Sequence, residues 1–440
     1  MKPISLLGKI LTPVRYARLG TALAAMAYVA ILLYYANAAY PKVGHDFAYF
    51  IPHLLDAHLH FAVDGPGIQW YTPTFGGGLP AYANPQDMQF TLAQLYMIVA
   101  DPWMAGLAAA ATYILLGFLC AYFFFERILR FHPMASALGA VFFGSNGFIF
   151  AHTIAGHMSF QAFPLFPALL IAIAHPGWPS YIKGISIAVI LSILIHSGGF
   201  YMAIIFALSA LLLLPFLQSD RFRIFLKPKR LLAAAGWALP FTFALTGSKI
   251  LAIRAFMRSF PRIEQDHYLA GLWGGLYSMF LQFLGPAPAV SGMRLAGKSI
   301  SDYVTYMRDV SRTDGMEMGI WEFDTGVSPA LLILLAAGFI FLLIQQFRRL
   351  FRLFRGRGVK FPKITPRGLI LAGLTLLCIW IAVEFRLTQG LIYHHLQKLP
   401  ILKSLHVNLR FASAFIFPLS LAGAWVFNRL FASASPVKRG

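Results

Sequence analysis

The sequence predicts an all-α, polytopic membrane protein whose single transmembrane domain covers residues 1–440. Hydrophobic residues make up 58% of the chain and charged residues only 12%, and the mean hydropathy is +0.68. Uninterrupted apolar runs of about twenty residues recur along its length, and a helix needs about that many to cross the hydrocarbon core of a bilayer. These observations exclude an ordinary soluble protein.

The apolar runs predict about ten transmembrane helices. We place them at residues 19–39, 104–125, 134–152, 161–175, 182–196, 199–217, 231–250, 328–347, 368–385 and 411–429. The three runs between 161 and 217 are short and are separated by small Pro/Gly turns, a pattern that is also typical of broken or steeply packed helices. The string ANA at 36–38 resembles a signal cleavage site. The run before it is longer than a signal core of about 7–15 residues, so we expect an uncleaved first helix.

The charge distribution predicts the orientation. The chain has 36 basic and 16 acidic residues. An even number of crossings places both termini on one side, and a cytoplasmic location for them collects most basic residues in short cytoplasmic loops, as the positive-inside rule requires. We therefore expect a multi-pass membrane protein with both termini in the cytoplasm. The basic loops are expected to contact anionic membrane lipids, and no nucleic-acid partner is expected.

This topology leaves three outer segments, at residues 40–103, 251–327 and 386–410. The first contains GHDFAYFIPHLLDAHLH at 44–60, in which a helix starting near Pro52 would carry His53, Asp56 and His60 on one stripe. With leucines on its other side, this helix is predicted to lie in the membrane interface and to turn its histidines toward water. Metal binding by the stripe is an alternative, although no H-E-x-x-H pattern or comparable motif occurs.

Asp46 follows the first predicted helix closely and has apolar neighbours, Phe47, Tyr49 and Phe50. An ionised carboxylate near the membrane is unfavourable unless it is paired or used. Partial desolvation would raise its pKa and make it a competent acid or base. We therefore expect a functional role for Asp46.

The stretch FGGGLPAYANPQ at 75–86 lies between aromatic and amide side chains, among them Trp70, Tyr71, Asn84 and Gln86. Glycine lets a backbone approach a ligand closely, and aromatic rings beside amides suit a sugar. An aromatic belt at the membrane interface explains the same residues equally well.

The other two outer segments contribute one helix and one cation. The run at 271–285 is too short to span the membrane and predicts a re-entrant or interfacial helix. Arg410 opens the last predicted helix. Its guanidinium suits a lipid phosphate, whereas snorkelling toward the interface is the alternative.

Four phrases are similar to patterns of bacterial YfhO-type membrane proteins: GHDFAYFIPHL, WYTPTFGGGLPAYANPQ, FGSNGFIFAHTIAGHMSFQAFPL and LHVNLRFASAFIFPLSLAG. More broadly, an Asp just after the first helix, an outer surface built from several loops and an Arg near the last helix resemble the GT-C superfamily of integral membrane glycosyltransferases. The resemblance extends over most of the chain.

This resemblance implies a protein of the bacterial cytoplasmic (inner) membrane. It also implies transfer of a sugar from a polyprenyl-phosphate donor to a glycan, lipid or protein acceptor on the outer face of that membrane. Asp46 matches the catalytic carboxylate, which takes the proton of the acceptor hydroxyl. Arg410 matches the position that holds the donor phosphate. Candidate substrate-binding residues are His45, His53, Trp70, Tyr71, Asn84, Gln86 and His157. No cofactor or metal ligand is assigned, and the need for a divalent cation stays open because His45 stands where a second acid would be expected.

Two other functions compete with the enzyme. A transporter or flippase of lipid-linked glycans would carry charged groups near the middle of the membrane and discontinuous helices. The predicted spans contain almost no charge in their middles, whereas the short helices near 197 keep this alternative open. A non-catalytic subunit of envelope assembly would tolerate any change at Asp46.

Overall fold

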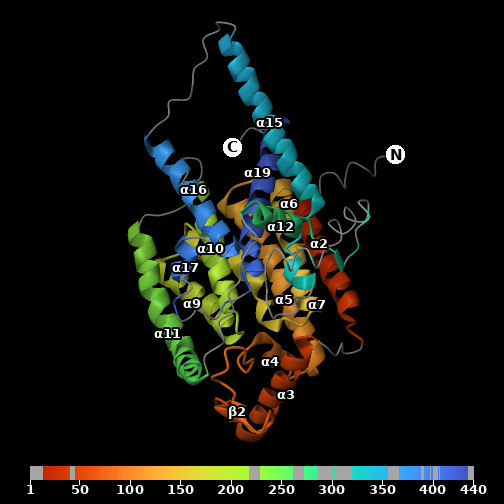
Figure 1. Ribbon diagram of the computed structural model, residues 1–440, viewed down its shortest axis with the longest axis vertical. Helices are drawn as coiled ribbons and strands as arrows, with labels where there is room; N and C mark the ends of the chain where they lie inside the picture. The colour runs from red at the N-terminus through yellow and green to blue at the C-terminus, as the bar shows by residue number, and fades with distance from the viewer. Residues whose placement is uncertain are drawn as a thin grey trace, which may run out of the picture.

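The computed structural model describes residues 13–39, 45–217, 228–260, 272–285, 297, 299, 301–302, 305, 320–354, 366–387, 391–396, 398–399, 405 and 407–434. Within these ranges the chain folds as a helical bundle with one very short antiparallel hairpin, in which β1 (Tyr71–Thr72) pairs with β2 (Leu79–Pro80) (Figure 1). The all-α prediction is therefore confirmed. Parts of each predicted outer segment, including residues 40–44, 261–271, 306–319 and 401–404, lie outside the described residues.

Seven helical stretches of the described chain are long and apolar enough to cross a membrane. They are Val14–Ala36, Pro102–Ile128, Pro133–Ile154, Lys229–Ser259, Pro329–Arg348, Leu369–Leu387 and Asn408–Leu430. Each coincides with a predicted apolar run, so the multi-span prediction is confirmed for these seven. The other three predicted spans correspond to shorter apolar helices, at Met158–Ala174, Ser180–His196 and Phe200–Leu214.

These spans are built from the following helices. In chain order they are α2 (Pro13–Ala36), α5 (Pro102–Phe123), α6 (Pro133–Gly144), α7 (Gly147–Ile154), α8 (Phe166–Ala174), α9 (Ser180–His196), α10 (Phe200–Leu217), α11 (Pro228–Ser259), α15 (Pro329–Phe354), α16 (Pro366–Leu387) and α19 (Ile416–Ala434). A π turn at Phe124–Ile128 extends α5, and a 3₁₀ stretch at Asn408–Phe415 precedes α19.

The three shorter helices have local causes. Before α8 the chain passes through two 3₁₀ turns, Met158–Phe160 and Phe163–Leu165, and Pro164 and Pro167 each remove a backbone donor there. Between α9 and α10, Gly198 has a φ of +71°, which glycine adopts without the steric penalty of other residues. Of the ten predicted spans, the described chain thus has seven as long helices and three as shorter apolar helices, the alternative that the Pro/Gly turns left open.

The core of the bundle is rich in phenylalanine. Helix α6 packs against α2, α5 and α19. The Phe417 ring of α19 lies 5.1 Å from the Phe143 ring and 5.2 Å from the Phe166 ring, measured between centroids. Such aromatic pairs add packing energy beyond the area they bury.

One end of the bundle carries α3 (Phe47–Asp64), the hairpin and α4 (Leu92–Tyr96), as Figure 1 shows, far from the end reached by the last turns of α15. Helix α3 begins at Phe47 rather than near Pro52, which lies inside it. The predicted start was wrong because Pro52 favours a first turn only as a local signal, whereas the contact between Asp46 N and Ala155 O fixes the start of α3.

The predicted short helix in the second outer segment is present as α12 (Leu272–Leu284). Its buried face carries Ser278 and Gln282, which accept hydrogen bonds from the buried Arg386 of α16 at 3.1 Å each. This helix therefore packs on the bundle through polar contacts. The remaining short helix of the described chain is α17 (Leu391–Leu396).

Candidate functional site

Four stretches far apart in sequence bring charged side chains together. Asp46 immediately precedes α3, His152 and His157 lie in and just after α7, Glu322 lies in the 3₁₀ turn η4 (Ile320–Phe323), and Arg410 lies in the 3₁₀ stretch before α19. We call these five residues the acid–histidine cluster. Each of the five side chains lies within 4 Å of another member of the cluster.

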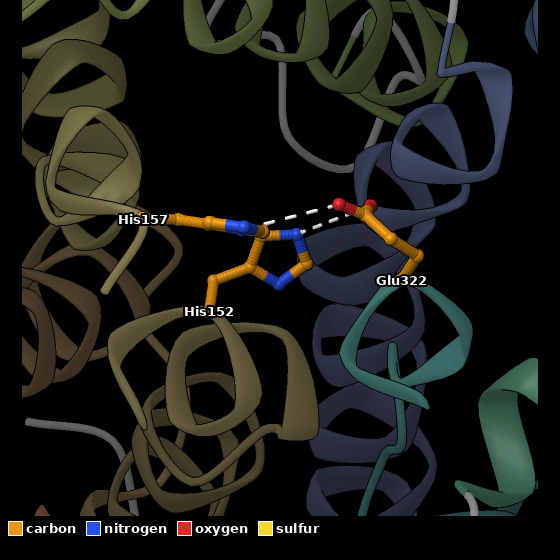
Figure 2. Close-up of side chains that lie close together, drawn as sticks. All are labelled: His152, His157 and Glu322. Atoms are coloured by element: carbon orange, nitrogen blue, oxygen red, sulfur yellow. Dashed lines mark ion pairs between the residues drawn. The ribbon is translucent and has the colours of Figure 1, made fainter. Parts of the chain in front are cut away.

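The contacts run from one side of the cluster to the other. The His157 Nε2 atom lies 3.2 Å from Asp46 Oδ2, and its Nδ1 atom lies 3.9 Å from Glu322 Oε1. The His152 Nε2 atom lies 3.6 Å from Glu322 Oε2. Figure 2 shows both imidazoles pointing toward the Glu322 carboxylate. Glu322 thus stands at the centre and Asp46 at the edge.

Local structure fixes the two histidines. The side chain of Asn146 caps α7 by accepting a hydrogen bond from Ile149 N at 3.0 Å, which places His152 in the last turn of the helix. Gly156 then turns the chain with a φ of +84°. A Cβ atom at Gly156 would lie 2.5 Å from Phe47 N, so the absence of a side chain allows this turn to touch the start of α3. Asp46 N donates to Ala155 O at 3.2 Å and secures the same contact.

Asp46 is the exposed member of the cluster. Its side chain is 49% exposed, compared with 6% for His157. The carboxylate makes no capping bond to its own helix, which leaves it directed at His157. Partial burial raises the pKa of Asp46, and the negative charge of Glu322 raises it further, whereas the Arg410 guanidinium lowers it. A carboxyl group with this exposure can meet a substrate hydroxyl.

Glu322 is buried and held ionised by its partners. Arg410 Nε donates to Glu322 Oε2 at 2.8 Å, and Arg410 Nη2 donates to Oε1. Burial disfavours the charged form, but this fork and the contact with His152 hold the pKa of Glu322 well below its usual range. Burial also disfavours the charged form of His157, and it lowers the pKa of this imidazole to about 2. The neighbouring His152 lowers that pKa further. His157 is therefore a neutral imidazole.

Arg410 is more enclosed than the sequence suggested. The guanidinium carbon lies 4.7 Å from the centroid of the Phe160 ring and 5.1 Å from that of the Tyr201 ring, so the cation is sandwiched by aromatic surface as well as paired. The structure thus brings the predicted base and the predicted phosphate ligand into one cluster. The sequence did not predict that two nitrogens of Arg410 already donate hydrogen bonds to the Glu322 carboxylate.

His45 and His53 have different surroundings. His45 is exposed, has a φ of +49°, and packs its ring 4.4 Å from the Trp321 ring beside the cluster. His53 is buried: its ring lies 4.3 Å from both the Tyr49 and Phe75 rings, and its Nδ1 atom lies 2.8 Å from Tyr49 O. The predicted water-facing role of His53 is therefore wrong, because the loop after β1 folds over it.

The polar stripe of α3 holds this loop. Asp56 accepts hydrogen bonds from Gln69 Nε2 at 2.8 Å and Thr72 Oγ1 at 3.0 Å. Metal binding by this stripe, the alternative drawn from the sequence, would therefore compete with the hydrogen bonds by which the Asp56 carboxylate holds the loop. His60 pairs instead with Asp64, with 2.9 Å between His60 Nδ1 and Asp64 Oδ2.

The residues predicted to bind a sugar divide into exposed and structural ones. Trp70 and Tyr71 are 57% and 56% exposed. Asn84 donates from Nδ2 to the Tyr49 hydroxyl at 2.5 Å and accepts from Gln86 N at 3.0 Å, so it stabilises the loop. The three glycines at 76–78 all have positive φ, which explains the FGGG string by turn geometry alone.

Sequence reasoning missed three features. His152 carried no signal beyond its place in AHTIAGH, and Glu322 appeared only as one acid of several in its segment. The third is a buried ion pair in which Lys249 of α11 contacts Asp87 at 3.2 Å. Burial raises the pKa of Asp87, and the Lys249 charge opposes that rise.

The cluster also has a composition suited to a metal ion. His152, His157 and Glu322 are all buried, and each offers one ligand atom, with these atoms within 4.8 Å of one another. No metal ligand was assigned from the sequence. The chemical capacities of the cluster are therefore proton transfer at Asp46 and coordination of a cation behind it.

No family model, curated protein or solved structure matches this chain. The findings define it as a helical multi-span membrane protein with seven candidate spans in its described part.

Proposed function

We propose that this protein is a membrane glycosyltransferase of the GT-C type, which moves a sugar from a polyprenyl-phosphate donor to an acceptor hydroxyl outside the cytoplasmic membrane. One observation carries the proposal: a half-exposed carboxylate, Asp46, lies 3.2 Å from the Nε2 atom of a buried histidine, His157. Asp46 directly precedes α3, which lies at one end of the bundle (Figure 1). A lipid-linked donor stays in the bilayer, so its enzyme must place its base near the membrane boundary.

In this mechanism Asp46 acts as the general base. It accepts the proton of the acceptor hydroxyl while the hydroxyl oxygen attacks the anomeric carbon of the sugar. The bond between that carbon and the phosphate oxygen breaks, and the lipid phosphate leaves with the electron pair. Because the neutral His157 occupies Oδ2 of Asp46 at 3.2 Å, the other carboxylate oxygen is available to the acceptor.

Arg410 stabilises the charge of the departing phosphate. Its Nε and one terminal nitrogen are taken by Glu322, and the remaining N–H groups of its fork are available to an anion. Glu322 thereby orients the guanidinium. Trp70 and Tyr71, exposed on the hairpin, offer flat surfaces for an acceptor.

The position of the charges favours an enzyme over the transporter alternative. His152 lies near the end of the candidate span Pro133–Ile154, and Arg410 near the start of Asn408–Leu430, whereas a transporter typically binds its substrate near the bilayer midplane. The basic last turns of α15 extend toward the opposite end of the molecule. We therefore propose that the Asp46 end faces outward and the basic end faces the cytoplasm.

The test is a transfer assay with purified protein and polyprenyl-phosphate sugars extracted from the native membrane. Asp46→Asn should retain donor binding and lose at least about 100-fold in turnover, since general base catalysis contributes roughly 10²–10⁴-fold. Asp64→Asn is the matched control, because this acid lies on the same helix, is 63% exposed and pairs only with His60 among the described contacts. Unchanged turnover in Asp46→Asn rejects the mechanism. Movement of labelled lipid across vesicles without transfer supports the flippase.

A further inference from the structure

We propose that His152, His157 and Glu322 bind a divalent transition-metal ion of the zinc class. The three side chains come from α7, the turn after it and η4, and their ligand atoms lie within 4.8 Å of one another in a buried location (Figure 2). This inference concerns binding of an ion and does not depend on the reaction proposed above.

The spacing is that of ligands around an ion rather than of hydrogen-bond partners. The two separations between a histidine nitrogen and a Glu322 oxygen are 3.6 Å and 3.9 Å, both longer than an effective hydrogen bond. In a tetrahedral zinc site with bonds of about 2.1 Å, neighbouring ligand atoms lie about 3.4 Å apart. The separations of 3.6 Å and 3.9 Å exceed that distance by about 0.2 Å and 0.5 Å.

Unsatisfied nitrogens point to a missing ligand. Within the described chain, neither ring nitrogen of His152 has a hydrogen-bond partner, and His157 Nδ1 has none. His152 is only 2% exposed. A buried donor or acceptor without a partner destabilises a protein by roughly 1–3 kcal/mol, and coordination to a metal would satisfy one nitrogen of each ring.

The surroundings are arranged as in known histidine metal sites. His157 Nε2 lies 3.2 Å from Asp46 Oδ2, so a proton on Nε2 leaves Nδ1, which faces Glu322, free to coordinate. A carboxylate behind a metal-bound histidine commonly fixes the tautomer in this way. Glu322 retains lone pairs for a metal, because a carboxylate has about four acceptor sites and the Arg410 fork uses two.

The charges and ligand types select the ion. Asp46 and Glu322 supply two negative charges against the one positive charge of Arg410, so the cluster tolerates a cation. Two imidazoles with one carboxylate favour zinc, cobalt or nickel over magnesium or calcium, which prefer oxygen ligands.

Protein purified without a histidine tag, stripped with chelator and desalted in detergent provides the test. On addition of zinc chloride we expect about one bound zinc per chain by mass spectrometry. Zinc should also raise the melting temperature of the stripped wild type, whereas magnesium should not. Cobalt should give the visible absorption of a tetrahedral ion.

His152→Gln and His157→Gln should each weaken zinc binding by at least about 100-fold, because each removes one of three ligands. His53→Gln is the matched control, since His53 is a buried imidazole with its own hydrogen bond, and it should bind zinc as the wild type does. Asp46→Asn removes only the outer partner of His157, which should lower zinc affinity by about 10–100-fold and still leave one zinc per chain at saturating zinc, so loss of transfer in that variant and loss of metal in the histidine variants are separate results. No zinc uptake by the stripped wild type, or unchanged uptake in the double variant His152→Gln/His157→Gln, overturns the inference.

Discussion

The buried ion pair between α11 and the first outer segment provides a stringent test of the packing. The ammonium of Lys249 donates three hydrogen bonds: to Tyr82 O at 2.7 Å, to Asn84 O at 2.9 Å and to Asp87 Oδ2 at 3.2 Å. The Lys249 side chain is completely buried, and Asp87 is 5% exposed. One lysine therefore satisfies three acceptors of the loop that covers α3.

Lys249→Met keeps the length of the side chain and removes its charge. Asp87 then remains as a buried carboxylate without its counter-charge, and breaking such a pair destabilises a protein by about 3–5 kcal/mol. The unfolding entropy is about 2.1 cal/mol/K per residue. For a 440-residue chain that unfolds as one unit, the melting temperature therefore falls by about 1 °C for each kcal/mol of lost unfolding free energy. We expect the melting temperature in detergent to fall by at least about 3–5 °C.

A second substitution separates charge from packing. Asp87→Leu in the Lys249→Met background removes the stranded carboxylate and should recover part of the lost stability, because replacing both partners of a buried pair by apolar residues is often neutral. The destabilisation of Lys249→Met should also shrink as the pH falls. Asp87 already has a pKa raised by burial, and protonation removes the buried charge.

The control is Lys398→Met, at an exposed position of the described chain. Thermal unfolding of the four proteins, followed at neutral and acidic pH, measures the effect. A melting temperature of Lys249→Met within 1 °C of the wild type, or a double variant that is no more stable than Lys249→Met, refutes the reasoning that charge burial controls this contact.

Two further predictions concern residues that are close in sequence to members of the acid–histidine cluster. Gly156→Ala should lower stability and transfer activity together, because its Cβ would lie 2.5 Å from Phe47 N and its φ is +84°. Gly236→Ala, with no atom within 4 Å of the new Cβ, should be neutral or stabilising. Equal melting temperatures for the two variants contradict the conclusion that close packing at Gly156 positions the cluster. Burial raises the pKa of Asp324 from 3.8 to about 6, so the protonated form favours folding and stability should fall by at most roughly 3 kcal/mol as the pH rises from about 4 to above 6. Asp324→Asn should flatten the dependence of stability on pH between about 4 and 6. If thermal unfolding shows the same pH dependence in Asp324→Asn and the wild type, Asp324 does not have the raised pKa.

The sequence predicted those elements whose signal is local. Seven long apolar runs coincide with seven long helices because crossing a bilayer fixes helix length independently of tertiary contacts. The start of α3 was missed by several residues, since Pro52 carried a first-turn signal while Gly156 and Ala155 determine where the helix begins. His53 was predicted to face water, because helical periodicity does not reveal that the Phe75 ring covers its imidazole.

The candidate site was only partly predictable for a related reason. Asp46 and Arg410 are unusual in their own surroundings, an acid and a cation beside apolar runs, and this local anomaly singles them out. Glu322 is 88 residues from Arg410 and lies among other acids, so no local pattern distinguishes it. Its partner is set by the packing of η4 against the start of the last span, a long-range contact that a single sequence does not encode in any short pattern.

The two carboxylates of the cluster differ because their environments differ. Glu322 is enclosed and paired with Arg410, so its charge is fixed and it serves as an anchor for the guanidinium and the imidazoles. Asp46 is half-exposed, touches only one imidazole of the cluster and has a raised pKa. Two acids with opposite shifts in one site are typical of a division between a group that holds charge and a group that exchanges protons. Exchange of protons requires access, and Asp46 is the carboxylate that has it.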